Sequence, residues 1–330
     1  MKPSISFVIP VRNDAVRLDA CLRSILKNGT GRGQIEIIVV DNGSSDGSAE
    51  VAASRGAKVL TVDQGRVSAL RNYGARHASA EVLAFIDADN EIVAGWVYAA
   101  LSCLQKPGVG AAGALYHAPS DGTWVQRVYD HLRGARHGQS EAYWLGSGNL
   151  AVRSDAFTAL GGFDTSLETC EDVEFCHRLR ASGLKIISDA RLKSVHHGDP
   201  RTLAEVFSGE RWRGRDNLRV SFRRPISWPS VPSAVIPIVH VALMAAAVIG
   251  LGAVAIAGRV GLLVFAAAIA AFVVPTGLRV IYAVVRDGHL HLGRMLQAFL
   301  VACAYDCGRA LALVSPAPHR RGEAPKVKLA

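Results

Sequence analysis

Residues 82–90 read Val-Leu-Ala-Phe-Ile-Asp-Ala-Asp-Asn, an apolar run that ends in two carboxylates one residue apart. An uninterrupted apolar run of this length is typical of a buried strand in a parallel sheet. Ligands of open α/β sheets bind just beyond the carboxyl ends of such strands. Because side chains alternate along extended backbone, Asp87 and Asp89 are expected to point the same way. These residues fit either a site for Mg²⁺ or Mn²⁺, or a plain Asp/Asn turn.

Strand and helix signals alternate on both sides of this run. Apolar runs predict strands at 4–11, 35–40, 57–62 and 82–86. Helical spacing and N-cap residues predict helices at 14–27, 45–54, 67–78 and 92–104. This β-α-β-α order indicates an α/β fold with a doubly wound, mostly parallel sheet. Residues 109–200 are less regular, and there we expect a helix at 171–181 and β-like pieces at 185–188 and 192–196.

The last third of the chain has a different composition. The chain has 330 residues, half of them hydrophobic, and the apolar excess lies after residue 230. Stretches at about 234–257, 260–285 and 293–314 are each long enough to cross a hydrocarbon core of roughly 30 Å as a helix. Asp306 and Arg309 lie in the third stretch, at a spacing that allows them to pair on one helix face. Since charges within a bilayer are costly, this third stretch fits a tilted interfacial helix or one that faces a helix bundle.

Composition predicts an order of regions along the chain. They are an α/β domain at 1–205, a basic interfacial linker at 206–232, membrane helices at 233–314 and a basic tail at 315–330. The net charge is +9, but the linker arginines alternate with Trp212 and Phe222, which suits an anionic membrane surface better than nucleic acid. The first thirty residues lack a signal-peptide pattern, so the α/β domain is expected on the cytoplasmic face of the inner membrane. The positive-inside rule then favours an interfacial third helix.

Four sequence elements should converge on one edge of the sheet. They are residues 8–13 with Pro10 and Arg12, residues 39–47 with Asp41, residues 65–74 with Arg71, and residues 87–89. Carboxylates can bind a base N–H or a ribose hydroxyl, Arg can pair with phosphates, and a metal can bridge to a diphosphate. The set therefore indicates a nucleotide-diphosphate site. The chain has no Walker A sequence, and no GxGxxG follows its first strand, which argues against a kinase, an ATPase or a dehydrogenase.

The ordered set resembles glycosyltransferase family 2, the inverting enzymes of GT-A fold, over about residues 4–200. The resemblance implies a Rossmann-like catalytic domain, followed here by the helical membrane region. It implies that Asp41 binds the nucleotide and that Arg71 lies near the diphosphate. Asp87-Ala88-Asp89 matches the DxD motif of the family. On this basis Asp89 would bind the ion directly, and Asp87 would support the ribose or a water on the ion.

Downstream, Gly162-Phe163-Asp164 followed by Glu171-Asp172 resembles a further module of the family. Asp172 would be the general base, because inverting transfer needs one carboxylate to take the proton of the attacking hydroxyl. Glu171 would lie on the acceptor side. The alternative is that both carboxylates simply favour the start of a helix, where the macrodipole is positive.

Further residues receive roles only through the resemblance. His196 and His197 follow a late strand, where the family often has a histidine at the metal, and the sequence does not separate the two. Gly148 and Asn149 resemble a loop on the acceptor side of the sugar pocket. Their alternative is a plain turn. Arg211-Trp212 partly matches the Gln-x-x-Arg-Trp motif of processive members, so this pair is also assigned to the acceptor side.

Together these patterns predict a membrane-anchored, metal-dependent inverting glycosyltransferase. It would move a sugar from a nucleotide-diphosphate donor to a lipid-linked or glycan acceptor in cell-surface polysaccharide or glycolipid synthesis. One alternative is a transferase that uses polyprenyl phosphate itself as acceptor. The alternative of another class is a non-catalytic membrane scaffold that binds nucleotide sugars. The donor sugar, the base, the acceptor and the linkage stay open.

Overall fold

The protein is described by a computed structural model that covers residues 3–29, 35–134, 138–223, 228, 231–286 and 292–314. The chain divides into two compact units. The described residues of the first unit lie in 3–119 and 138–199, and those of the second in 120–134 and 200–314. Residues 120–134, which the sequence analysis assigned to the α/β domain, therefore group with the C-terminal helices. The predicted basic tail at 315–330 lies outside the described residues.

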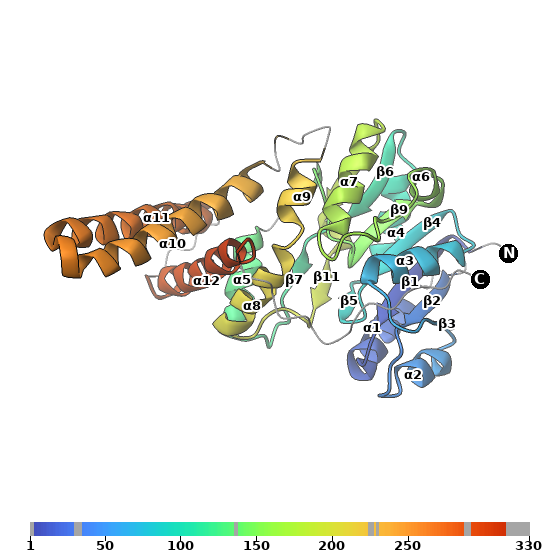
Figure 1. Cartoon of the computed structure of the whole chain (residues 1–330). Coiled ribbons are helices and arrows are strands. Elements are labelled where there is room, and N and C mark those ends of the chain that lie inside the picture. Colours follow the sequence, from blue (N-terminus) through green and yellow to red (C-terminus); the bar gives the residue numbers. More distant parts are fainter. Residues whose placement is uncertain are drawn as a thin grey trace. The chain divides into compact units, whose positions relative to one another are not determined.

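The first unit is built on an eight-stranded sheet in the order β3-β2-β1-β4-β9-β6-β10-β8 (Figure 1). The strands β3, β2, β1 and β4 are parallel, as the alternating sequence pattern predicted. A separate three-stranded sheet has the order β5-β11-β7. The strands are β1 (Ile5–Val11), β2 (Ile35–Asp41), β3 (Lys58–Thr61), β4 (Val82–Ile86), β5 (Asn90–Ile92), β6 (Val109–Gly113), β7 (Tyr116–His117), β8 (Gln139–Glu141), β9 (Asn149–Arg153), β10 (Lys185–Asp189) and β11 (Ser194–His196).

Helices cover both faces of the large sheet (Figure 1). Alternate side chains of β1 enter two different cores: Phe7 packs with residues of α1 and α4, and Val8 packs with residues of α3, α6 and α7. Strands that are buried on both faces need continuous apolar runs. This is why the sequence pattern was sufficient to predict β1, β2 and β4. The helices and one short 3₁₀ turn of this unit are α1 (Ala15–Asn28), α2 (Ser48–Ser54), α3 (Val67–Arg76), α4 (Trp96–Leu104), α6 (Ser154–Ala159), α7 (Glu171–Ala181) and η1 (Ala190–Leu192).

The structure of this unit differs from the sequence prediction at several places, of which two bear on the sheet beside the predicted site. The helix expected at 92–104 begins only at Trp96, because residues 90–92 form β5 and pair with β11. The strand β9 was not predicted, and it runs antiparallel between β4 and β6 in the middle of the sheet. Its pairing partners lie more than thirty-five residues away in sequence, so no local pattern could reveal its place.

The second unit is entirely helical in its described residues. It contains α5 (Trp124–Arg133), α8 (Leu203–Arg213), α9 (Asn217–Ser221), α10 (Val231–Ala257), α11 (Arg259–Arg286) and α12 (Leu292–Leu311). Among the described helices, α10 and α11 are long and apolar enough to cross a membrane, whereas α12 does not meet that criterion. Large apolar side chains are exposed along both, including Ile256 at 93% and Leu263 at 68%. Exposed apolar surface of this kind is characteristic of membrane or partner contact.

The two apolar helices pack closely through glycines. A Cβ atom built on Gly250 would lie 2.6 Å from the Phe265 nitrogen, and one built on Gly261 would lie 2.6 Å from the Val254 nitrogen. Small residues at such a crossing let helix backbones approach, and this is a common basis for helix association in membranes.

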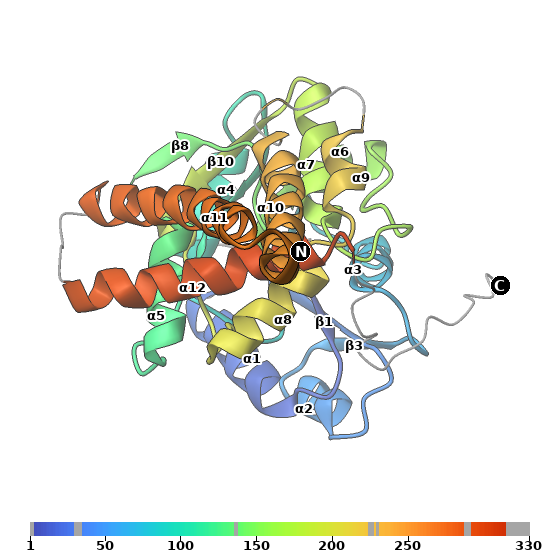
Figure 2. The ribbon, with the colours of Figure 1, turned by 60° about the vertical axis from the view of Figure 1, so that its left-hand side comes forward.

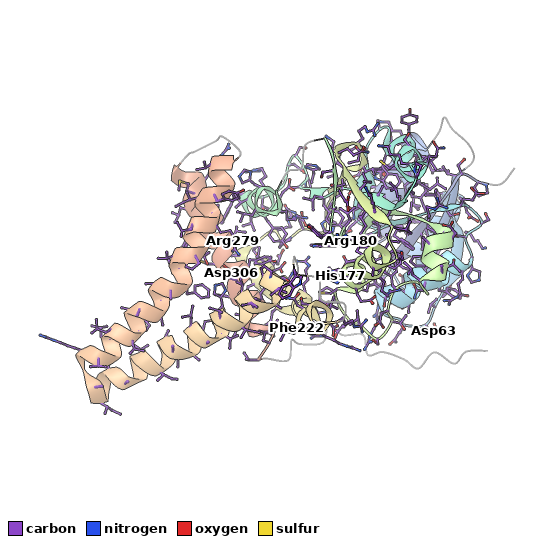
Figure 3. All side chains as sticks on the ribbon, turned by 90° about the horizontal axis from the view of Figure 1, so that it is seen from above. Asp63, His177, Arg180, Phe222, Arg279 and Asp306 are labelled. Carbon is purple, nitrogen blue, oxygen red and sulfur yellow. The ribbon has the colours of Figure 1, made fainter. Side chains whose placement is uncertain are left out.

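Asp306 and Arg309 do not pair with each other, which corrects the prediction from their spacing. The Asp306 carboxylate accepts hydrogen bonds from Thr276 and Arg279 of α11, both at 2.8 Å. Arg309 instead donates to Glu210 of α8 at 2.6 Å. Figure 3 labels Asp306 and Arg279, and Figure 2 shows α11 and α12 running side by side. Asp306 and Arg309, one turn apart on α12, therefore bind side chains of two different helices. Their spacing within α12 could not indicate these partners.

Glu210 is the centre of a buried polar cluster in the second unit. Its side chain is 1% exposed, and it accepts hydrogen bonds from Tyr129 of α5 at 2.6 Å and from Arg213 at 2.8 Å, besides that from Arg309. Burial raises the pKa of Glu210, but Arg309 and Arg213 outweigh that effect, so the net pKa is lowered and the carboxylate stays charged. Glu210 therefore ties α5, α8 and α12 together.

Replacing Glu210 by Ala is expected to destabilise the protein by about 3–5 kcal/mol, because it leaves Arg213, Arg309 and the Tyr129 hydroxyl without their shared acceptor. Denaturant unfolding of the detergent-solubilised chain, followed by circular dichroism, measures this change. Asp155→Ala is the matched control: Asp155 pairs with Arg153, but its side chain is 66% exposed, so a loss below about 1 kcal/mol is expected. Equal stability of the two variants would refute the role of the cluster.

Candidate active site

The carboxyl ends of β1, β2 and β4 meet at one edge of the large sheet. Val11 is in register with Asp41, and Val8 with Phe85, so the segments that follow these strands are neighbours. Asp41 is buried, and its Oδ2 accepts a hydrogen bond from the Ser44 N–H at 3.2 Å. Its Oδ1 is buried and has no partner among the described residues. A buried carboxylate oxygen without a donor is costly, so this atom fits the N–H of a base or a sugar hydroxyl.

The turn after β1 is joined to the turn after β2. Asn13 has a left-handed backbone with φ of 51°, and its side chain accepts a hydrogen bond from the Ser45 N–H at 2.7 Å. Pro10 is buried within β1, whereas Arg12 is exposed just beyond that strand. Of the predicted donor-binding residues of this segment, only Arg12 therefore presents its side chain to solvent.

Arg71 bridges two carboxylates that are distant in sequence. Its guanidinium pairs with Asp87 after β4 at 2.5 Å and with Glu171 of α7 at 2.8 Å. The side chain is only 4% exposed. The helix α3 comes this close to the sheet because Gly74 packs directly on Val8 and Val40, with no room for a Cβ atom. Arg71 thus fixes the positions of Asp87 and Glu171 relative to each other.

The loop before β9 lies against Asp87. The Asp87 N–H donates to the Gly148 carbonyl at 3.1 Å, and a Cβ atom on Gly148 would lie 2.1 Å from Asp87 Oδ2. Asn149, by contrast, is fully buried. Its amide binds Trp96 and the carbonyls of Ala114 and Leu192. The acceptor-side prediction for Asn149 is corrected accordingly, since its side chain is used inside the core.

The helix α7 begins at the same site. Cys170 precedes it with a left-handed φ of 62°, an unusual conformation for a residue other than glycine, and this turn brings Glu171 and Asp172 to the loop before β9. Ser147 donates its N–H to Asp172 Oδ2 at 3.4 Å and its hydroxyl to Glu171 Oε1 at 3.2 Å. Burial and the adjacent Glu171 carboxylate raise the pKa of Asp172 to about 7. A carboxylate with this pKa is well suited to exchange a proton near neutral pH.

Asp89 and His196 form a pair beside Asp87. The His196 Nε2 atom lies 3.4 Å from Asp89 Oδ1, and the Nδ1 atom is bonded to the buried Asp199 at 2.7 Å. Burial lowers the pKa of His196, but Asp89 and Asp199 outweigh it and raise the pKa to about 9. A metal-binding histidine commonly holds a carboxylate with its second nitrogen, as His196 does here. Gly198 makes room for this pair, since a Cβ atom there would lie 1.9 Å from Asp89 Oδ2.

His197 is turned to a different partner. Its Nε2 atom is 2.6 Å from Glu91, while its backbone N–H donates to the Asp89 carbonyl at 2.9 Å. The described residues contain no cluster of three or more His, Cys, Asp or Glu side chains that could hold a metal. Asp89 and His196 offer two ligands of suitable type for Mn²⁺, and phosphate oxygens of a substrate commonly supply the remaining ones.

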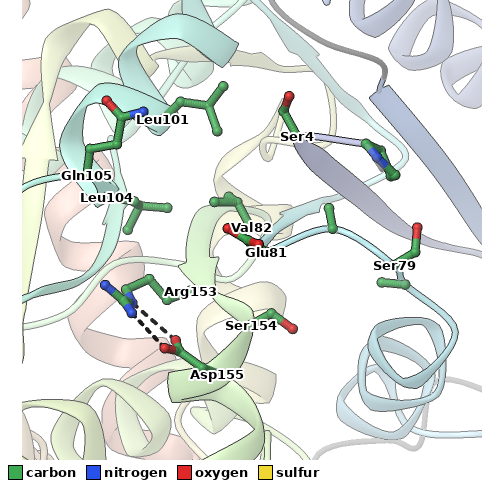
Figure 4. A pocket seen from close by; sticks show the side chains of 13 residues that line it. Ser4, Ser79, Glu81, Val82, Leu101, Leu104, Gln105, Arg153, Ser154 and Asp155 are labelled. Carbon is green, nitrogen blue, oxygen red and sulfur yellow. Dashed lines mark hydrogen bonds and ion pairs between the residues drawn. The ribbon is translucent and has the colours of Figure 1, made fainter. Parts of the chain in front are cut away.

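A groove of 1050 Å³ lies elsewhere on the first unit (Figure 4). Its lining includes Ser4 before β1, Val82 at the start of β4 and Arg153 at the end of the antiparallel β9. These positions mark the amino ends of the parallel strands, opposite the edge with Asp41 and Asp87. Figure 4 shows Arg153 paired with Asp155 in this groove. The groove is therefore separate from the carboxylate-rich edge.

Some predicted residues fall outside this arrangement, and others were missed. Arg211 and Trp212 lie on α8 in the second unit, and their acceptor-side role stays a prediction. Tyr116 and Asp199 both contact His196 and were not predicted from the sequence. Asp199 lies three residues after His196, a spacing that could have signalled it. Tyr116 carries no comparable local signal.

The chain is similar in sequence to known glycosyltransferases. Residues 6–160 match the family model described as glycosyl transferase family 2. A glycosyltransferase of Haloferax volcanii, AglE, is 30% identical over 194 residues, which span 56% of this chain and 64% of that protein. The pre-mycofactocin glycosyltransferase of Mycobacterium tuberculosis is 27% identical over 234 residues, which span 67% of this chain and 48% of that protein. The chain thus spans less than two thirds of the curated relatives named here.

Two solved structures share the fold. A mannosyltransferase from Pyrobaculum calidifontis, in complex with GDP-Man and Mn²⁺, has a TM-score of 0.57 at 19% identity and covers 93% of this chain and 87% of its own. GalNAc-T7 with UDP, GalNAc and Mn²⁺ has a TM-score of 0.50 at 18% identity, and the match covers 62% of this chain and 47% of that one. The GT-A fold with a mostly parallel central sheet, expected from the sequence, is confirmed.

Proposed function

Because residues 6–160 match the model of glycosyl transferase family 2, we propose that the protein is a membrane-anchored, inverting glycosyltransferase. It would transfer a sugar from a nucleotide-diphosphate donor to a lipid-linked or glycan acceptor, in the synthesis of a cell-surface polysaccharide or glycolipid. The observation that carries the proposal is that Asp41, Asp87 and Asp89 lie at the carboxyl ends of neighbouring strands. Arg71 joins Asp87 to Glu171, and Ser147 of the loop before β9 donates to Asp172.

We assign donor binding to the edge formed by β1, β2 and β4. The unpartnered Asp41 Oδ1 would accept from the base or the ribose, and Arg12 would reach a phosphate. Asp87, held by Arg71, would support the ribose or a water on the metal. Asp89 and His196 would hold a divalent cation, Mg²⁺ or Mn²⁺, which supplies positive charge to the departing diphosphate. His197 is the weaker candidate, because it pairs with Glu91.

The transfer step is assigned to Asp172. The acceptor oxygen attacks the anomeric carbon on the face opposite the diphosphate while Asp172 takes the hydroxyl proton. The bond between the anomeric carbon and the phosphate oxygen breaks in the same step, so the configuration inverts and the diphosphate leaves with the electron pair. A pKa of about 7 lets Asp172 be charged before the step and neutral after it. Gly148 and Glu171 border this position, and we keep Arg211 and Trp212 as acceptor-side residues.

The apolar helices support a membrane location for the acceptor. We propose that α10 and α11 span the inner membrane, that α12 lies at its interface, and that the catalytic domain faces the cytoplasm. A reporter fused after residue 330 should then read as cytoplasmic. A periplasmic signal would mean that α12 crosses the bilayer.

The proposal is tested with the full-length protein in detergent or native membranes. A panel of nucleotide sugars is supplied with Mn²⁺ and a membrane lipid extract, and release of nucleoside diphosphate is measured with and without EDTA. We expect metal-dependent release from one donor, increased by the extract. The absence of release from every donor would instead favour the non-catalytic scaffold. A transferase acting on polyprenyl phosphate needs no base, so it would survive Asp172→Asn, and loss of activity in that variant contradicts it.

A further inference from the structure

Tyr116 joins two parts of the proposed site that are distant in sequence. It lies in β7, next to the strand β11 that carries His196 (Figure 1). Its ring stacks on the His196 ring, with centroids 5.0 Å apart and 29° between the planes. Its hydroxyl oxygen accepts a hydrogen bond from the Gly148 N–H at 3.1 Å. One side chain thus contacts both a proposed metal ligand and the loop before β9.

Two glycines of that loop pack closely against the Tyr116 hydroxyl. A Cβ atom on Gly146 would lie 2.5 Å from the Tyr116 hydroxyl oxygen, and one on Gly148 would lie 2.9 Å from it. Asp87 closes the loop from the other side, because its N–H donates to the Gly148 carbonyl at 3.1 Å. The loop is therefore clamped between Asp87 and Tyr116, with no space for side chains at either glycine.

The clamped loop in turn holds the proposed base. Ser147 lies between the two glycines, and its N–H and hydroxyl bind Asp172 and Glu171 respectively. We propose that Tyr116 is a positioning residue, which through its hydroxyl sets the loop that orients Asp172 and through its ring supports His196. This inference rests on the proposed function, since it assigns Tyr116 a part in the same transfer reaction. The two contacts come from different atoms, so they can be removed separately.

Tyr116→Phe removes the hydroxyl and keeps the ring. We expect kcat for transfer to fall about tenfold, because the loop that orients Asp172 loses its hydrogen bond to the Tyr116 hydroxyl. The affinity for the nucleoside diphosphate with Mn²⁺, measured by calorimetry, should stay within about twofold, because the stack on His196 persists. Tyr116→Leu removes the stack as well, so the Mn²⁺ concentration for half-maximal activity should rise by about tenfold. Tyr98→Phe, which removes a half-exposed hydroxyl on α4, is the control and should match the wild type.

A double-mutant cycle separates positioning from general damage. Gly146→Ala should lower kcat about fivefold or more in the wild-type background, because the new methyl group meets the Tyr116 hydroxyl. In the Tyr116→Phe background the same change should cost less than about twofold, since the nearest remaining ring atom is 3.2 Å away and the ring can shift. Equal effects in both backgrounds would overturn the proposed contact.

The outcomes also distinguish this inference from the proposed function. If the wild type releases no nucleoside diphosphate from any donor, the proposed function fails. If the wild type is active and Tyr116→Phe keeps its kcat, or loses nucleotide affinity as strongly as kcat, the positioning role fails while the function stands.

Discussion

Asp172→Asn is expected to reduce sugar transfer by about 10³-fold while nucleoside-diphosphate binding changes by less than about twofold. The amide keeps the shape of the side chain but cannot take a proton. The two carboxylate oxygens accept from different backbone donors, the Val173 N–H at 2.8 Å and the Ser147 N–H at 3.4 Å. The single amide oxygen can keep the shorter contact, with Val173 at the start of α7, so this helix start should persist. Nucleoside-diphosphate release with a saturating acceptor measures the transfer, and calorimetry measures the binding.

The pH profile gives an independent reading of the same residue. Burial and Glu171 raise the pKa of Asp172 to about 7, and only the deprotonated form accepts a proton. With Mn²⁺ saturating at every pH, the wild-type kcat/KM should therefore be flat above pH 7 and fall about tenfold per pH unit below it, and the residual activity of Asp172→Asn should lack this limb. Glu81→Gln, at the amino edge of the sheet, serves as the control. Near wild-type turnover in Asp172→Asn would defeat the assignment.

Asp89→Ala is expected to lower metal-dependent transfer by about 10²–10³-fold, more than Asp87→Ala does. Asp89 faces His196 at the proposed metal position, whereas Asp87 is held by Arg71 and is proposed to support the ribose or a water on the ion. Paramagnetic resonance of bound Mn²⁺ provides a readout besides activity, and Asp89→Ala should abolish the bound signal at concentrations that saturate the wild type. An unchanged Mn²⁺ signal in Asp89→Ala would exclude it as a ligand.

The two histidines form a matched pair for the same measurement. His196→Ala should weaken Mn²⁺ binding strongly, because its Nε2 atom faces Asp89 and its other nitrogen is fixed by Asp199. His197→Ala removes only the partly exposed contact with Glu91, so its effect should be within about threefold. Equal losses of Mn²⁺ affinity in the two variants would contradict the assignment of His196, and not His197, as a metal ligand.

Most of the parallel half of the sheet could be predicted from the sequence. The strand at 82–86 and the helix at 171–181 have the bounds that the pattern indicated. Both depend on local signals: an apolar run buried on two faces, and acidic residues at a helix start with a glycine after its end. The β-like piece expected at 192–196 contains β11, but β9 and the two strands that pair with β11, β5 and β7, were not predicted. Their pairing is antiparallel or made by segments of two or three residues.

The sequence alone was enough to indicate an α/β domain with apolar helices after it, because burial imposes periodicities that are written into neighbouring residues. It also showed which carboxylates follow the strands. The tertiary structure decided what those groups contact: that Arg71 joins Asp87 to Glu171, that His196 and not His197 faces Asp89, that Asn149 is buried in the core, and that Arg309 binds Glu210 rather than Asp306. These choices depend on the direction of single side chains across long sequence separations, which no local pattern encodes.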